Sequence, residues 1–210
     1  MYAYRDFWSI RKDRPGTRQT GTGTRSSCHC VCATPARFNV SHPNLQILQG
    51  DVANAESVRN AIKGQDAVLS ALGAASPFKY DPIVVEGVRH LVQAMEQENV
   101  KRFIYMSFAG VAEKRDGVGF VIKYVAPKLL RTEIAGHTAR EHIIRQSSLD
   151  WTIVHPTTLT TGPHTQEYKS GENVASKGFV VKIARADVAD FMLKQLTDRQ
   201  YVRKTPRVMY

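Results

Sequence analysis

The residues best suited to do chemistry follow stretches that read as buried strands. Ser107 offers a hydroxyl that can hydrogen-bond a substrate carbonyl, and Asp51 offers a carboxylate that can accept from an amino group. Ligands of parallel α/β sheets bind outside the carboxyl ends of the strands. We therefore predict one ligand site along this edge, which comprises Asp51, Val52, Ala71, Leu72, Gly73, Ser107, His155, Pro156 and Thr157.

Some of these residues also have plainer interpretations. Asp51 could cap the helix that follows it, a role compatible with ligand binding. Gly73 lets a ligand approach the backbone, but it could also simply make a turn. Pro156 fixes a turn after His155 that could present the backbone to a ligand.

Strands and helices alternate after residue 44. Apolar runs predict strands at 45–49, 66–72, 102–107 and 151–155. Helical spacing predicts helices at 54–63, 128–146 and 186–196, and a further helix that begins at Pro82. Gly64 is expected to end the first of these helices. Shorter strands are expected near 167–169, 179–183 and 207–208. The alternation predicts an α/β fold with a Rossmann-like, doubly wound parallel sheet.

Two apparent motifs are discounted. Tyr124 and Lys128 have the spacing at which a lysine can lower a tyrosine's pKa for acid–base work. That geometry requires a continuous helix, which Pro127 interrupts. The group His137, Glu141 and His142 could suggest a metal or a base, but a solvated helix face is the commoner arrangement.

The three cysteines, Cys28, Cys30 and Cys32, would present their sulfurs on one face of a strand without a second ligand pair, so no metal site is predicted. No cysteine follows Cys32, which favours a reducing, cytoplasmic location. No apolar run is long enough to span a bilayer, and the expected partner is a small molecule, without a membrane. The sequence does not indicate an oligomeric state.

The chain has 210 residues, enough for one domain, and a formal net charge of +10. Up to Phe38 there are seven Lys or Arg against two Asp, so half of the excess charge lies in that short segment. No aromatic and basic platform accompanies the charge, and nucleic-acid binding is not expected.

Several of these stretches resemble a known family. They are GDV at 50–52, SALG at 70–73, YMS at 105–107, GHTARE at 136–141 and above all LDWTIVHP at 149–156. Together they resemble the NAD(P)H-binding, NmrA-like branch of atypical short-chain dehydrogenases, which includes flavin, biliverdin and quinone reductases. The resemblance covers residues 36–210. It implies a Rossmann fold, NADP or NAD as cofactor, and hydride transfer to a flat conjugated acceptor. Ser107 is our candidate catalytic residue, because at the end of the central strand its hydroxyl could hydrogen-bond a substrate carbonyl or the nicotinamide amide.

The chain departs from that family at two points. Family members usually have arginine where His155 stands. Their glycine-rich loop presents backbone N–H groups to the pyrophosphate, and residues 8–16 (WSIRKDRPG) contain no such loop. We therefore expect the first strand and the loop to be lost, residues 1–35 to be an aberrant segment without a regular central strand, and residues 36–210 to form the NAD(P)-binding domain.

The genetic code offers an explanation. Read one base later, codons permitted for residues 8–16 can spell Gly-Ala-Ser-Gly-Lys-Thr-Gly-Arg, a glycine-rich turn. The same frame can continue as an amphipathic helix and a second strand that ends in arginine, which would pair with the 2′-phosphate of NADP. We interpret the segment as a frameshift that returns to frame near Thr34.

Two functional classes follow from the resemblance. The first is an NAD(P)H-dependent reductase of small conjugated acceptors, with cofactor binding impaired in the chain as written. The second is a non-catalytic, NmrA-like regulator that senses the NAD(P)H to NAD(P) ratio and acts through a protein partner.

Overall fold

The computed structural model describes residues 7–12, 26–32, 43–73, 76, 80–112 and 115–210. Its main sheet has the strand order β3-β2-β1-β4-β5-β6-β10-β8. The strands are β1 (Phe7–Lys12), β2 (Ser26–Cys32), β3 (Leu45–Gln49), β4 (Ala67–Ser70), β5 (Arg102–Met106), β6 (Asp150–Pro156), β8 (Lys169–Gly171) and β10 (Arg207–Met209). The first six strands have the order 3-2-1-4-5-6 of a doubly wound dinucleotide-binding fold, which confirms the predicted fold class.

The central strand runs in an unexpected direction. β1 pairs antiparallel with both β2 and β4, whereas β2–β3, β4–β5 and β5–β6 pair parallel. The first strand is therefore present, contrary to the expectation that segment 1–35 lacks a central strand, but it is not the parallel strand of a Rossmann unit. The remaining residues of that segment lie outside the described ranges.

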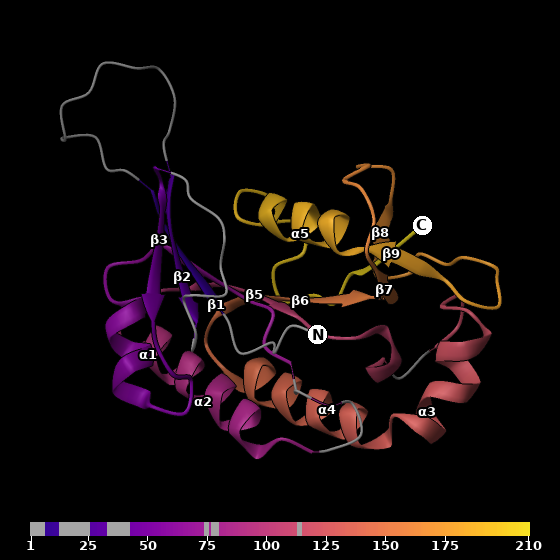
Figure 1. Ribbon diagram of the computed structural model, residues 1–210, viewed down its shortest axis with the longest axis horizontal. Coiled ribbons are helices and arrows are strands. Elements are labelled where there is room, and N and C mark those ends of the chain that lie inside the picture. Colours follow the sequence, from indigo (N-terminus) through magenta and orange to yellow (C-terminus); the bar gives the residue numbers. More distant parts are fainter. Residues whose placement is uncertain (1–6, 13–25, 33–42, 74–75, 77–79, 113–114) are drawn as a thin grey trace.

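Both faces of the sheet are covered (Figure 1). The helices α1 (Ala55–Ile62), α2 (Pro82–Gln97) and α4 (Arg131–Gln146) pack on one face, and α5 (Arg185–Lys194) packs on the other. Neighbouring strand residues alternate between the two cores: Phe103 and Tyr105 join the α2 and α4 core, while Ile104 joins the α5 core. A near-continuous apolar strand is the expected sequence for such a position.

The helix boundaries follow local sequence signals, with one exception. Asn54 caps α1 by accepting from Ser57 N, and Pro82 occupies the first turn of α2. The predicted helix 128–146 is instead two helices, α3 (Ala126–Leu129) and α4, because the chain leaves helical geometry at Leu130. Gly64 follows α1 with φ 74°, one residue beyond the capping Lys63.

A smaller lobe closes the carboxyl-terminal end of the sheet. It contains a 3-10 helix, η2 (Ala109–Val111), a π-helix, η3 (Val121–Val125), and a parallel pair of strands, β7 (Thr158–Thr160) and β9 (Lys182–Ala184). Strand β7 was not predicted, while β8, β9 and β10 lie near their predicted positions. Within the described part of the chain, no helix is long and apolar enough to cross a membrane.

Candidate functional site

Ser107 lies at the centre of a buried polar cluster. It follows β5, is 4% exposed, and its hydroxyl donates to Glu141 Oε1 at 2.5 Å. The same hydroxyl lies 3.3 Å from His137 Nδ1. On the neighbouring strand β6, His155 Nε2 lies 2.8 Å from the same Glu141 oxygen. The structure thus brings Ser107 and His155 together through a carboxylate on α4.

The cluster continues outward along α4. His137 Nε2 lies 3.0 Å from Glu133 Oε1, and Arg145 Nη2 lies 3.0 Å from Glu141 Oε2. Glu133, His137, Glu141 and Arg145 are spaced four residues apart and therefore share one helix face. Arg140, 1% exposed, donates to the carbonyl of Leu72 beyond β4 at 3.0 Å. This helix therefore links the ends of three neighbouring strands.

The carboxylates of the cluster are ionised at neutral pH. Burial opposes ionisation, but hydrogen bonds from His155, Ser107 and Arg145 lower the pKa of Glu141 to about 2. Burial opposes the charge of Glu133 too, yet contacts with His137 and Arg140 lower its pKa. Burial lowers the pKa of His137, so its neutral form is favoured.

Ser107 has one proton for two acceptors. If neutral His137 donates from Nε2 to Glu133, its Nδ1 is an acceptor. The Ser107 hydroxyl can then donate either to Glu141 or to His137, and a third acceptor competes with both. A serine so placed can donate its proton to a ligand oxygen in place of Glu141 or His137.

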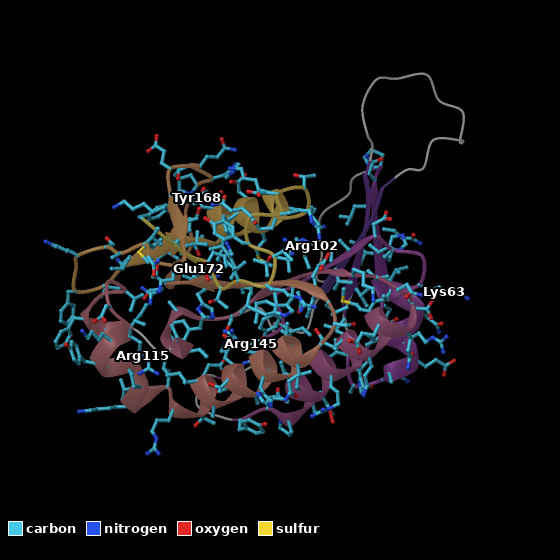
Figure 2. All side chains as sticks on the ribbon, turned by 180° about the vertical axis from the view of Figure 1, so that it is seen from behind. Lys63, Arg102, Arg115, Arg145, Tyr168 and Glu172 are labelled. Carbon is cyan, nitrogen blue, oxygen red and sulfur yellow. The ribbon has the colours of Figure 1, made fainter. Side chains whose placement is uncertain are left out.

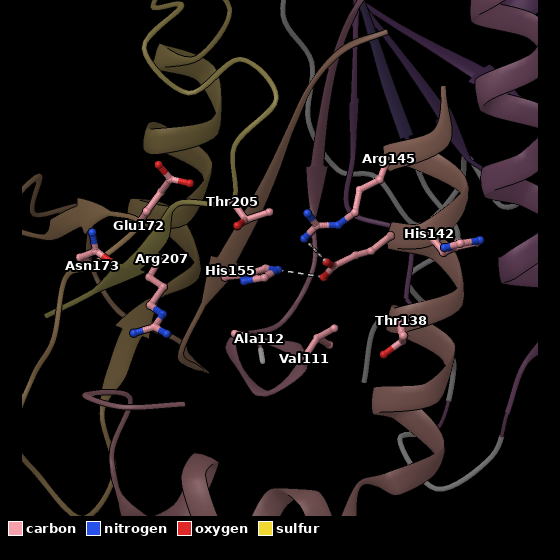
Figure 3. Close-up of a pocket in the computed structure, with 11 residues that line it drawn as sticks. Val111, Ala112, Thr138, His142, Arg145, His155, Glu172, Asn173, Thr205 and Arg207 are labelled. Carbon is pink, nitrogen blue, oxygen red and sulfur yellow. Dashed lines mark hydrogen bonds and ion pairs between the residues drawn. The ribbon is translucent and has the colours of Figure 1, made fainter. Parts of the chain in front are cut away.

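A cavity of about 590 Å³ opens beside this cluster (Figure 3). Glu141, Arg145 and His155 form one wall, and Arg207 and Thr205 adjoin them. Glu172 and Asn173, after β8, lie opposite α4. Val111, Ala112, Thr138 and His142 complete the lining. The cavity is large enough for a small ligand, and its lining offers hydrogen bonds on several sides.

The other predicted site residues are more scattered. Asp51 is exposed, and its Oδ1 accepts from Ala53 N at 2.9 Å, while Asn54 caps the helix; the capping interpretation of Asp51 was wrong. Val52 is buried in the core, and its carbonyl faces His90 Nδ1 at 2.8 Å. Two strands, β2 and β1, separate this region from β4.

The residues beyond β4 and β6 lie close to the cluster. Leu72 is buried, with Ala71 and Gly73 half-buried beside it. Pro156 and Thr157 are buried at the end of β6. Thr157 Oγ1 has no hydrogen-bond partner among the described residues, which leaves an unsatisfied polar atom at the carboxyl edge.

The discounted motifs have distinct outcomes. Tyr124 is 52% exposed in η3, and Lys123 rather than Lys128 lies over its ring at 5.3 Å. The solvated-face interpretation was wrong for His137 and Glu141, which are 7% and 4% exposed. The sequence contains one signal for this burial. The helix α4 must pack on the sheet, yet it has few apolar residues before Ile143, so some of its polar side chains had to be buried.

The described residues fit a dinucleotide at two of its three parts. The ends of β4, β5 and β6 suit the nicotinamide, and exposed Asp51 suits the adenine. The pyrophosphate needs backbone N–H groups at the carboxyl end of the first strand. Phe7, at the amino end of β1, pairs with Ser70, whereas Ile10 pairs with Ala67, so the carboxyl end of β1 lies at the opposite edge of the sheet. The described residues do not fit the pyrophosphate.

Comparisons with known proteins agree with this architecture. An oxidoreductase, ylbE, from Lactococcus lactis superposes with a TM-score of 0.70 at 20% identity, over 86% of this chain and 78% of its own. A short-chain dehydrogenase/reductase from Veillonella parvula, crystallised with NADP, gives 0.62 at 20% identity, over 80% and 73%. Similarity at this identity establishes the fold.

Sequence comparison identifies the family. The UPF0659 protein YMR090W of Saccharomyces cerevisiae is 30% identical over 151 residues, which are 70% of this chain and 63% of that protein. The chain thus spans less than two thirds of that relative's length. The model of an NAD(P)H-binding family matches residues 28–199, most of the chain, and leaves residues 1–27 unmatched. The chain belongs to this NAD(P)H-binding family.

Proposed function

We propose that residues 36–210 form the domain of an NAD(P)H-dependent reductase that acts on a small conjugated acceptor of flavin, quinone or biliverdin type. The observation that carries the proposal is the buried Ser107 hydroxyl, which donates to Glu141 and lies near His137, beside a cavity lined by Glu141 and His155. Such acceptors present carbonyl oxygens, which match the donors of the cavity. The reduced nicotinamide supplies the hydride when bound.

The chain's own contribution is to hold the acceptor. Ser107 is the catalytic residue in this proposal, because its hydroxyl lies just after β5 and contacts Glu141, which lines the cavity. Glu141 positions both Ser107 and His155 through hydrogen bonds of 2.5 and 2.8 Å. Asp51, Gly73 and Thr157 are proposed to contact the cofactor, and the preferred cofactor is NADP or NAD.

We further propose that the aberrant segment 1–35 impairs cofactor binding. The reversed β1 and the unmatched residues 1–27 support this view. A shifted reading frame would restore a parallel first strand with a glycine-rich turn at its carboxyl end. Sequencing the coding DNA tests the origin of the segment: an uninterrupted frame through residues 8–32 would contradict the frameshift.

The activity is tested on a chain that carries the shifted-frame sequence through residue 33. Oxidation of NADPH by a quinone or a flavin is followed by absorbance. We expect turnover, and Ser107→Ala should lower kcat/KM by about a hundredfold in a variant that circular dichroism shows to be folded. Ser148→Ala, at an exposed serine, is the matched control. Tight cofactor binding without turnover for any acceptor would refute the reductase and favour the redox-sensing regulator.

A further inference from the structure

The lobe beyond the cavity carries a cluster of exposed apolar side chains. Phe179 is 67% exposed, Leu129 65%, Tyr124 52%, Phe120 48% and Val180 38%. We call these five residues the aromatic patch. Contiguous exposed apolar surface marks a site of interaction, and three of these side chains, Phe120, Tyr124 and Phe179, contact one another.

The patch is assembled from two segments far apart in the sequence. Phe120 and Phe179 stack with ring centroids 5.2 Å apart, and Tyr124 lies 5.0 Å from Phe120. Backbone bonds from Phe120 N to Gly178 O (3.2 Å) and from Val121 N to Phe179 O (3.1 Å) join η3 to the loop before β9. These bonds hold the rings in place rather than leaving them on separate loops.

Glycine allows the two segments to approach. Gly119 has φ 90°, and a Cβ at that position would lie 3.1 Å from Val181 N. A side chain there would be strained and crowded. The close approach of Gly119 to Val181 therefore brings the two segments of the patch together.

Basic residues flank the patch residues in the sequence. Lys123 lies over the Tyr124 ring and pairs with Asp116 at 2.6 Å. Lys128 and Arg131 are exposed on and just after α3, and Lys177 is exposed on the loop. Apolar tips among lysine and arginine are typical of surfaces that enter the interface of an anionic bilayer.

We propose that the aromatic patch, with Lys123, Lys128, Arg131 and Lys177, docks the protein on the surface of an anionic lipid bilayer. Phe120, Tyr124 and Phe179 would enter the headgroup region, and the cations would face the lipid phosphates and carboxylates. The proposal does not depend on cofactor binding. The lack of a long apolar run predicted no membrane partner, but a patch assembled from separate segments does not produce such a run.

A second copy of the chain suits the patch less well. The exposed parts of the five side chains sum to on the order of 500 Å², whereas a stable interface buries about 800 Å² per partner. Pairing two patches would also bring the two sets of cations together. Like charges facing one another oppose such a contact.

The test is co-sedimentation of the full chain with phosphatidylcholine vesicles, with and without phosphatidylserine. We expect binding only to the anionic vesicles, weakened by salt. Phe179→Ser should weaken it by about tenfold, and Lys128→Gln by about fivefold. The matched controls are Leu193→Ser on α5, which removes another apolar side chain that is more than half exposed, and Lys63→Gln at the far end of the molecule (Figure 2).

The controls separate a local surface from the general positive charge of the chain. If Lys63→Gln weakens binding as much as Lys128→Gln, net charge alone is responsible and the proposal is overturned. Absence of binding to anionic vesicles at low salt would also overturn it. A dimer in solution that Phe179→Ser dissociates would assign the patch to a second copy instead. Unchanged melting curves establish that each variant is folded.

Discussion

Replacing Glu141 by glutamine should destabilise the protein at neutral pH. Its carboxylate is buried and receives hydrogen bonds from Ser107, His155 and Arg145. Its pKa of about 2 lies well below the ordinary value of 4.5. At about 1.4 kcal/mol per pKa unit, this difference corresponds to roughly 3 kcal/mol of stability. With a urea dependence of about 2 kcal/mol per molar, the midpoint should fall by roughly 1.5 M.

The pH dependence follows from the sign of the shift. Because folding lowers the pKa of Glu141, its contribution is fully present above about pH 5 and is lost as the pH falls toward 2. The difference between wild type and Glu141→Gln should therefore shrink to less than about half of its neutral value near pH 3. Urea unfolding at several pH values measures it.

A matched control separates this effect from a general change of charge. Glu172→Gln removes the same charge from the exposed opposite wall of the cavity and should leave the midpoint nearly unchanged. Equal destabilisation by the two substitutions, or a Glu141→Gln effect that does not depend on pH, would show that the hydrogen bonds to Glu141 do not have the assigned role.

Three further predictions concern other sites. Arg102→Met should cost about 3 kcal/mol in urea unfolding, because it leaves the carbonyls of Gln195 and Asp150 without their buried donor; a neutral substitution would contradict this. Asp187→Asn should make residues 161–168 more sensitive to limited proteolysis. Burial opposes the charge of the Asp187 carboxylate, but hydrogen bonds from Tyr210 and Thr165 hold its pKa well below the usual range, and an amide would lose the charge that strengthens these bonds. An unchanged cleavage pattern would argue against it. Tyr124→Phe should leave reductase activity of the frame-corrected chain within about twofold, and a large loss would restore the tyrosine as a catalytic residue.

Much of the fold could be predicted because its strands are defined locally. Residues 45–49 form β3 as predicted, and the apolar run at 102–107 forms β5 through Met106. The break at Leu130 was missed because helical spacing continues across it.

The candidate site could be predicted only in part. Strand ends indicated Ser107 and His155, since the parallel topology places them at one edge. Their partner Glu141 is distant in sequence from both, and its role depends on the rotation of α4 against the sheet. Local charge patterns predict solvation for such a helix, whereas long-range packing buries its polar face.

The antiparallel direction of β1 could not be predicted from the sequence, for a different reason. Residues 7–12 were expected to form no strand, yet the vacant position between β2 and β4 offers unpaired backbone groups on both sides. A short segment can satisfy these groups in either direction. Antiparallel pairing fills the sheet without rebuilding the phosphate-binding turn.

Calorimetric titration of NADPH into two chains tests the central claim most directly. One chain is as written, and the other carries the shifted-frame sequence through residue 33. Losing three charge-assisted backbone bonds to the pyrophosphate costs on the order of 5 kcal/mol, or more than about a thousandfold in affinity. We predict no measurable heat of binding for the chain as written and saturable binding for the corrected chain. Micromolar binding by the chain as written would contradict the account.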